Sequence, residues 1–179
     1  MTHPILALDG VSLHLPDGRA LFSNLNLQFD LRRTGLVGRN GVGKSMLARL
    51  LAGELAPTTG LCLRGARVAC LSQQAGSGQA ASVAELAGIA TIANALARIE
   101  AGSVDPRDFD AVGEHWHIAA RLRQACQAHG LAHVSIDTPV ASLSGGEAMR
   151  VALLGATLFD PDFLILDEPS NHLDAGGRA

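Results

Sequence analysis

A glycine-rich run near residue 40 has the residue types of a phosphate-binding loop. Residues without a Cβ let backbone N–H groups curl around an anion, and the positive end of a following helix adds to the attraction. Lys44 can reach the β and γ oxygens of a nucleotide, and the Ser45 hydroxyl can bind Mg²⁺. The run therefore predicts a site for a nucleoside triphosphate with magnesium, formed by Gly38, Arg39, Asn40, Gly41, Val42, Gly43, Lys44 and Ser45.

Two adjacent carboxylates follow an apolar segment late in the chain. Asp167 comes directly after the run 163–166, and Glu168 is the next residue. The carboxyl end of a parallel strand is where ligands of α/β proteins bind. We expect Asp167 to hold the Mg²⁺ through water, and Glu168 to be the general base that polarises the attacking water.

A second glycine-bearing turn stands between the loop and the carboxylates. Ser144, Gly145 and Gly146, followed by Glu147, open a helix predicted from about Gly145 to Leu158. One nucleotide seldom needs two anion-binding helix ends. Because a helical segment is expected to carry this turn away from the glycine loop, the simplest geometry has it face the γ-phosphate held by a partner domain.

The elements that position these residues follow from the apolar pattern. Apolar and polar residues alternate over 11–15 and 25–29, with Pro16-Asp17-Gly18 between them, which predicts an antiparallel hairpin. Gly35-Leu36-Val37 predicts a strand that enters the glycine loop, and leucines at helical spacing predict a helix over 46–55. Strand, loop and helix form the context that a phosphate loop requires.

Beyond residue 80 the sequence becomes helical in character. Ser82 and Glu85 form a predicted capping box, and an apolar stripe continues from there to residue 99. Asp105 followed by Pro106 predicts a second helix that continues toward Gly130. We therefore expect a single domain over residues 1–179. Residues 76–139 would be an inserted helical subdomain, and residues 1–75 and 140–179 the ATP-binding core.

Composition limits the function classes. With 47% apolar and 17% charged residues the chain is expected to be a soluble globular protein, and its formal charge of -3 gives no global attraction to nucleic acid, so no direct DNA binding is expected. It has no bilayer-spanning apolar run and no leader pattern at the start, which predicts a cytoplasmic protein without membrane insertion. The three cysteines match neither a zinc site nor a disulfide framework.

Together the motifs resemble the ATP-binding-cassette superfamily, most closely its F subfamily of soluble translation factors. The resemblance rests on the glycine loop, on Leu-Ser-Gly-Gly-Glu before Arg150-Val151-Ala152-Leu153, and on Asp167-Glu168-Pro169-Ser170-Asn171-His172-Leu173-Asp174. Transporter subunits more often have glutamine at the position of Glu147 and Ser-Ala-Leu-Asp in the last loop. The resemblance implies an α/β P-loop NTPase fold of cassette type, with an antiparallel β region and an inserted helical subdomain.

The same resemblance implies the ligands and further roles. ATP and Mg²⁺ would be bound by the glycine loop with Met46, and Ser144, Gly145, Gly146 and Glu147 would face a nucleotide on the partner. Gln73, with Gln74 as a neighbouring candidate, would sense Mg²⁺ and water beside Lys44 and Glu168. The residues Asn171 to Asp174 would form the loop that crosses to the partner.

Three departures from the family pattern bear on function. Met46 replaces the usual hydroxyl residue, and His14-Leu15-Pro16 stands where an aromatic would stack on adenine, so base stacking should be weak. The family also places a switch histidine after a further strand, and the sequence stops first. We therefore expect the C-terminal strands of the fold to be missing, with an uncovered sheet edge and apolar surface.

The leading hypothesis is one half of a two-cassette ATPase that acts on the ribosome. A second cassette, in the same protein or a homodimer, would sandwich two ATP molecules with this one. A second hypothesis is the nucleotide-binding subunit of a membrane transporter. A third is a module that binds Mg-ATP with poor turnover when isolated.

Overall fold

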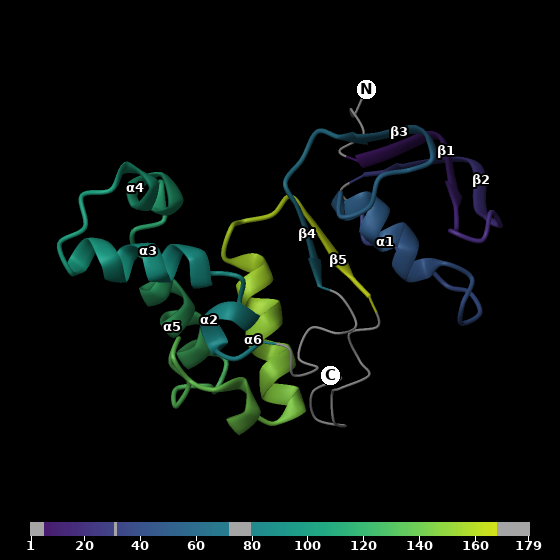
Figure 1. Cartoon of the computed structure of the whole chain (residues 1–179). Coiled ribbons are helices and arrows are strands. Elements are labelled where there is room, and N and C mark those ends of the chain that lie inside the picture. The colour runs from purple at the N-terminus through teal and green to yellow at the C-terminus, as the bar shows by residue number, and fades with distance from the viewer. Residues whose placement is uncertain (1–5, 31, 72–79, 168–179) are drawn as a thin grey trace. The chain divides into compact units, whose positions relative to one another are not determined.

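The computed structural model of the chain describes residues 6–30, 32–71 and 80–167 (Figure 1). These residues form two compact units. The first contains residues 6–71 and 160–167, and the second contains residues 80–159. The glycine loop therefore belongs to the first unit and the second glycine-bearing turn to the other.

The first unit contains a three-stranded antiparallel sheet in the order β2-β1-β3. Its strands are β1 (Leu6–His14), β2 (Ala20–Phe29) and β3 (Thr59–Arg64). Leu6 of β1 pairs with Phe29 of β2 and with Arg64 of β3. The predicted antiparallel hairpin over the first third of the chain is thus confirmed.

A second, parallel sheet of the same unit joins β4 (Val68–Leu71) to β5 (Phe163–Leu166). The helix α1 (Lys44–Ala52) contacts strands of both sheets. Its Leu47, Leu50 and Leu51 are buried in one cluster with the inward side chains of β1. Since burial of apolar surface is the main stabilising contribution, this cluster fixes the helix that follows the glycine loop.

The strand predicted at Gly35-Leu36-Val37 is not formed, because no neighbouring strand pairs with this segment. In the described part of the chain, β4 and β5 pair only with each other. A strand needs hydrogen-bonding neighbours, whatever its apolar content. Leu36 and Val37 are instead 56% and 93% exposed, and Leu166 at the end of β5 is 43% exposed. This unit therefore carries uncovered apolar surface.

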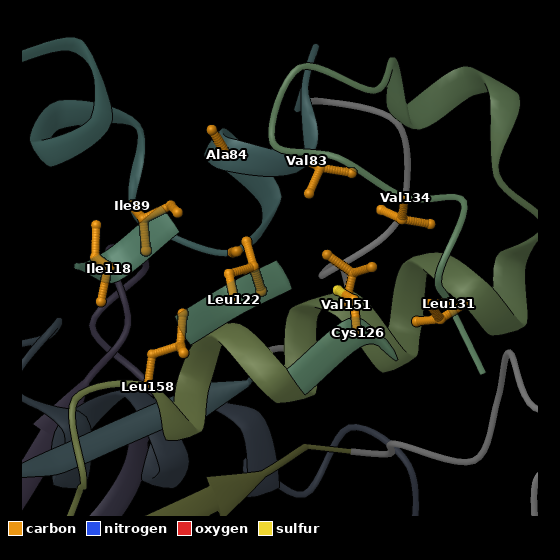
Figure 2. Packing of buried hydrophobic residues seen from close by; sticks show 11 residues of the cluster. Val83, Ala84, Ile89, Ile118, Leu122, Cys126, Leu131, Val134, Val151 and Leu158 are labelled. Carbon is orange, nitrogen blue, oxygen red and sulfur yellow. The ribbon is translucent and has the colours of Figure 1, made fainter. Parts of the chain in front are cut away.

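The second unit is helical and has one buried apolar cluster (Figure 2). Figure 2 labels Ile89, Ile118, Leu122, Cys126 and Val151 within this cluster. Among the described residues, no helix is long and apolar enough to cross a membrane. The unit consists of α2 (Val83–Leu86), α3 (Ala90–Glu100), α4 (Pro106–Val112), α5 (Ile118–Ala128), the 3₁₀ turn η1 (Val140–Ser142) and α6 (Gly145–Thr157).

The helices α2 to α5 correct the sequence prediction, which placed two longer helices over this region. The first breaks at Gly88, with a φ of +72°, and the second at Gly113, with a φ of +50°. A residue with positive φ cannot continue a right-handed helix, and glycine adopts that conformation at little cost. The predicted starts are confirmed, since the Ser82 and Asp105 side chains accept backbone hydrogen bonds at the N-termini of α2 and α4.

Residues 140–159 pack with the helical unit, whereas the predicted division grouped them with the ATP-binding core. Ala148, Val151 and Ala152 of α6 are buried. Gly155 lies so close to α2 that a Cβ there would overlap the backbone of Ala87. α6 therefore belongs by packing to the unit that begins at residue 80.

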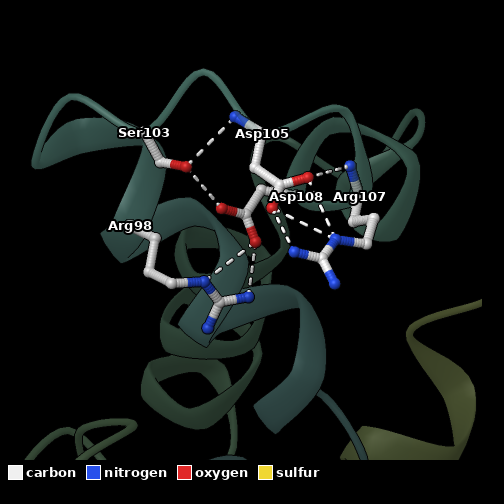
Figure 3. Close-up of polar contacts among 5 residues, drawn as sticks. All are labelled: Arg98, Ser103, Asp105, Arg107 and Asp108. Carbon is white, nitrogen blue, oxygen red and sulfur yellow. Dashed lines mark hydrogen bonds and ion pairs between the residues drawn. The ribbon is translucent and has the colours of Figure 1, made fainter.

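Polar contacts hold the segment between α3 and α4 (Figure 3). The Asp108 side chain is only 8% exposed, and its Oδ1 accepts from Arg98 Nε and Nη2 at 2.8 and 2.6 Å. Its Oδ2 accepts from Ser103 Oγ at 2.7 Å. The hydrogen bonds from Arg98 and Ser103 hold the pKa of Asp108 below its ordinary value.

Candidate functional site

The glycine loop ends at Gly43, which is the N-cap of α1 and has a φ of +104°. The positive φ favours glycine, and a Cβ at this position would lie 2.8 Å from Phe22 Cζ, so that the Phe22 ring would have to shift. In the described structure no side chain caps this end of α1. The first backbone N–H groups of the helix are therefore open to an anionic ligand.

Lys44 folds back over the same loop. Its Nζ donates to the carbonyl oxygens of Gly38 and Arg39, at 2.9 and 3.2 Å. The loop is closed further by the Val42 N–H, which donates to Arg39 O at 3.3 Å. Hydrogen bonds between an ammonium group and phosphate oxygens are stronger than those to neutral carbonyls. A bound triphosphate could therefore replace these carbonyls as the partner of Lys44.

Asp167 lies where the sequence predicted, directly after the parallel strand β5. Its N–H donates to Leu71 O at 3.0 Å, which extends the pairing of β4 and β5 by one residue. Ser45 lies in the first turn of α1 in the same unit. A hydroxyl and a carboxylate are hard oxygen ligands, the kind that Mg²⁺ prefers together with phosphate oxygens and water. These residues fit a Mg-ATP site.

Burial raises the pKa of Cys70, on β4, to about 11, with smaller contributions from the carboxylates of Glu54 and Asp167. This thiol is therefore protonated at neutral pH and is no nucleophile. Among the described residues, no group of three or more His, Cys, Asp and Glu side chains could hold a metal ion.

Several predicted site residues lie outside the described residues. These are Gln73 with its neighbour Gln74, the proposed base Glu168, and the segment from Asn171 to Asp174. Their roles stay predictions. The described structure brings the glycine loop, Lys44, Ser45, Met46 and Asp167 into the first unit.

Residues of the second glycine-bearing turn cap the N-terminus of α6. Ser144 is the N-cap of α6, and its Oγ accepts from the N–H of Glu147 at 3.3 Å. Glu147 Oε2 in turn accepts from Ser144 N at 2.8 Å and from Ser144 Oγ at 2.7 Å. This is a complete capping box, and its hydrogen bonds are the main reason that the pKa of Glu147 is lowered.

One residue that contacts this turn, His133, was not predicted from the sequence. Its Nε2 lies 3.2 Å from the second carboxylate oxygen of Glu147. The two residues come from separate segments of the helical unit, so no local spacing could have linked them. The only available signal was the apolar pair Leu131 and Val134 around it, which indicates an anchored turn.

Comparisons with known proteins identify a family and relatives for this chain. The family model described as ABC transporter matches residues 22–171. ABC transporter F family member 3 of Arabidopsis thaliana is 35% identical over 96% of the chain, and ATP-binding cassette sub-family F member 3 of Rattus norvegicus is 37% identical over 96%. The energy-dependent translational throttle protein EttA of Escherichia coli (strain K12) is 31% identical over 98%.

Solved structures show the same fold. A metal-chelate type ABC transporter in an inward-facing conformation matches 98% of the chain with a TM-score of 0.66 and 22% identity, over 65% of its own chain. CbiO1 from Clostridium perfringens, part of the transporter complex cbiONQ, matches 97% with a TM-score of 0.62 and 25% identity, over 69% of its own chain. The predicted cassette-type P-loop NTPase fold is confirmed.

The chain belongs to the ABC transporter family of ATP-hydrolysing cassette domains, with curated relatives in its F subfamily. It spans 21% of the Arabidopsis relative, 22% of the rat relative and 35% of EttA. A single cassette is thus compared with longer proteins. What those proteins do as a whole can be carried to this chain only as a proposal.

Proposed function

We propose that this chain binds Mg-ATP at its glycine loop and presents the N-terminus of α6 to ATP on a second cassette, as one half of an F-subfamily ATPase that acts on the ribosome. One observation carries the proposal. The chain has two helix N-termini suited to anions, and they lie in different compact units. Two such cassettes, in one protein or as a homodimer, would enclose two nucleotides.

The first half of the site supports binding of the triphosphate. The open N-terminus of α1 and the ammonium of Lys44 would hold the β- and γ-phosphates. Ser45 and Asp167 would hold Mg²⁺, which polarises the γ-phosphate when bound. Gln73 and Glu168 would orient and activate the attacking water, and these two roles rest on the family resemblance.

The ribosome as partner rests on the relatives. EttA is named as a translational throttle protein, and the other relatives carry the F-subfamily name. Glu147 and the Asn-His-Leu-Asp run favour the same subfamily. A ribosomal role places the chain in the cytoplasm, and its net charge of -3 argues for a local contact rather than general attraction to nucleic acid.

The alternative role as nucleotide-binding subunit of a transporter is favoured by the solved structures, since both described above come from transporters. That hypothesis requires a membrane partner for the cassette. The third hypothesis, ATP binding with poor turnover, concerns the isolated chain, in which Leu36, Val37 and Leu166 are exposed. Such uncovered apolar surface promotes association and lowers solubility.

ATP binding can be tested on Lys44 directly, because it is the only lysine in the chain. An amine-acetylating reagent would label Lys44 and the α-amino group, and intact and peptide mass spectrometry would separate the two sites. We expect Mg-ATP to slow labelling of Lys44 by about tenfold through its phosphate contacts, with the α-amino group as internal reference. Equal labelling rates at saturating Mg-ATP would contradict the proposed site.

The ribosomal role needs the protein with its second cassette. We expect Glu168→Gln to prevent hydrolysis and to hold the closed ATP state, so that the protein sediments with ribosomes in ATP but not in ADP. Lys44→Ala in the same background should abolish this retention. Recovery of the Glu168→Gln protein with a membrane protein, and never with ribosomes, would support the transporter hypothesis instead.

A further inference from the structure

The most informative contact outside the glycine loop joins a turn of the helical unit to the start of α6. Glu147 Oε2 is occupied by the backbone N–H and the hydroxyl of Ser144. The other oxygen, Oε1, lies 3.2 Å from His133 Nε2. Both carboxylate oxygens therefore have partners, and the capping box has a tether that the capping motif itself does not require.

The turn that carries His133 is fixed by the core. Leu131 and Val134 are buried, and the N–H of Val134 donates to Leu131 O at 3.0 Å across the turn. Both belong to the same buried cluster as Val151 of α6, as the labelled side chains in Figure 2 show. The backbone of the turn is thus held against the helix that Ser144 caps.

His133 itself contributes little to this core, since 59% of its side chain is exposed. Glu147 is less accessible, with 23% of its side chain exposed. A partly exposed histidine on a fixed turn is well placed to limit the rotamers of a facing carboxylate. Removal of its imidazole should therefore disturb the carboxylate more than the fold.

The position of the Glu147 carboxylate in turn affects the Ser144 hydroxyl. In the capping box Oγ donates to Glu147 Oε2 and accepts from Glu147 N, so the Glu147 side chain sets the Ser144 rotamer. The hydroxyl proton is engaged by Glu147 in this state, so a γ-phosphate would have to displace Glu147 to receive it. A fixed Ser144 rotamer keeps Oγ in place at the helix N-terminus for that exchange. The Glu147 carboxylate would repel that anion, and two cationic groups face it, His133 when protonated and Arg150.

We propose that His133 is a positioning residue that holds Glu147 and, through it, fixes the Ser144 side chain at the N-terminus of α6, which would face the γ-phosphate on the partner cassette. This rests on the proposed function, because it assumes that Ser144 meets a nucleotide across the interface. It assigns no contact between His133 and ATP. The expected effects are therefore on the step that needs α6, and not on nucleotide binding at the glycine loop.

The tether can be tested first without nucleotide. Amide hydrogen exchange of Ser144 and Glu147 would be measured by NMR in the chain, in His133→Ala, and in His133→Gln, whose side-chain amide can donate to Oε1. We expect His133→Ala to speed exchange of the Ser144 amide by up to about fivefold, the range for a partly exposed pair, and His133→Gln to restore slow exchange. His129→Ala, at another exposed histidine of the same unit, is the matched control.

The role in turnover requires the two-cassette protein and a double-mutant cycle. We expect His133→Ala to lower kcat for ATP by up to about fivefold with KM unchanged, because the glycine loop is intact. In a Ser144→Ala background the same change should have no further effect, since His133 acts through Ser144. His133→Gln should recover most of kcat, and His129→Ala should match the parent.

The outcomes separate the two proposals. Equal kcat for His133→Ala and His129→Ala, or an undiminished effect of His133→Ala in the Ser144→Ala background, would overturn the positioning role and leave the ATPase proposal intact. No ATP protection of Lys44 and no turnover in the parent protein would overturn the proposed function, and the positioning role with it. Unchanged exchange at Ser144 would show that the tether does not hold the cap.

Discussion

The N-termini of α1 and α6 are the two predicted anion-binding helix ends, and they differ in how they are capped. At α1 the cap is Gly43, which has no side chain, and Lys44 lies over the loop. At α6 the cap is Ser144, whose hydroxyl and N–H are both engaged by Glu147. The first end is open to a ligand, whereas the second already has an internal carboxylate in the place of one.

This difference suggests a division of labour. An open helix end with a lysine can bind a phosphate group by itself. A capped end has to exchange an internal partner for an external one, so its gain from an anion is smaller. We infer that the α6 end contributes only when a partner cassette brings a nucleotide that is already bound, which would make closure of the two cassettes sensitive to ATP.

The largest expected effect is on the free energy of unfolding, from a substitution in α6, the helix that Ser144 caps. Gly155→Ala should force α6 away from α2, because its Cβ would overlap the Ala87 backbone. We expect a loss of about 2–3 kcal/mol in the free energy of unfolding, as is typical of an overpacked core. Leu153→Ala, at a partly exposed position of the same helix, is the control and should cost less. Denaturant titration followed by helical circular dichroism would measure both, and equal stability of Gly155→Ala and parent would contradict the close approach.

The next largest expected effect is on nucleotide binding at the open N-terminus of α1. Gly43→Ala introduces a Cβ at 2.8 Å from Phe22 Cζ in a left-handed conformation, whereas Gly41→Ala, with a φ of +80°, meets no atom within 4 Å. We expect Gly43→Ala to weaken Mg-ATP binding by about tenfold, consistent with strain of the size found at such positions, and Gly41→Ala to have a smaller effect. Protection of Lys44 from acetylation would report the affinity. If both variants bind alike, steric fit at Gly43 does not set the loop geometry.

Features set by neighbouring residues in the sequence were predictable, whereas features set by tertiary neighbours were not. Hairpin, caps and helix starts at Ser82, Asp105 and Ser144 were predictable, because a cap depends on residues three or four positions apart. The breaks at Gly88 and Gly113 were missed, since the apolar stripe continues across them and Ile89 stays buried although the chain turns. The strand at 35–37 failed for a different reason, because pairing depends on a neighbour that no local pattern reveals.

In the candidate site, too, the contiguous motifs were predictable and a contact that depends on packing was not. The glycine loop and the α6 turn were predictable because each is a contiguous motif whose backbone does the binding. The position of Asp167 was predictable from the apolar run before it, and the parallel pairing of β5 with β4 in the structure agrees with the expected parallel sheet. His133 was not predictable, since its contact with Glu147 depends on how the turn at Leu131 packs against α6.

A smaller effect tests whether the N-terminus of α6 takes part in ATP binding at the N-terminus of α1. Ser144→Ala should lower the free energy of unfolding by about 1 kcal/mol through loss of the cap, while ATP protection of Lys44 stays at the parental value. Ser82→Ala, which removes the N-cap hydroxyl of the short helix α2, is a matched capping control. If Ser144→Ala weakened binding of ATP to the isolated chain as much as Gly43→Ala does, the two ends would share one nucleotide and the division of labour would be wrong.

The smallest expected effect is on the melting temperature at low pH. Hydrogen bonds from Arg107 hold the pKa of Asp105 at about 2, below an ordinary value of about 4. Because the folded pKa is depressed, this cap contributes stability that is complete above the unfolded pKa and is lost as the pH falls from about 4 to about 2. Asp105→Asn keeps an oxygen acceptor at the cap but has no proton to gain, so its melting temperature should fall less over that interval than that of the parent. Thermal unfolding at several pH values would measure the difference. Parallel curves would mean that this helical unit, despite its paired carboxylates, owes none of its acid sensitivity to the α4 cap.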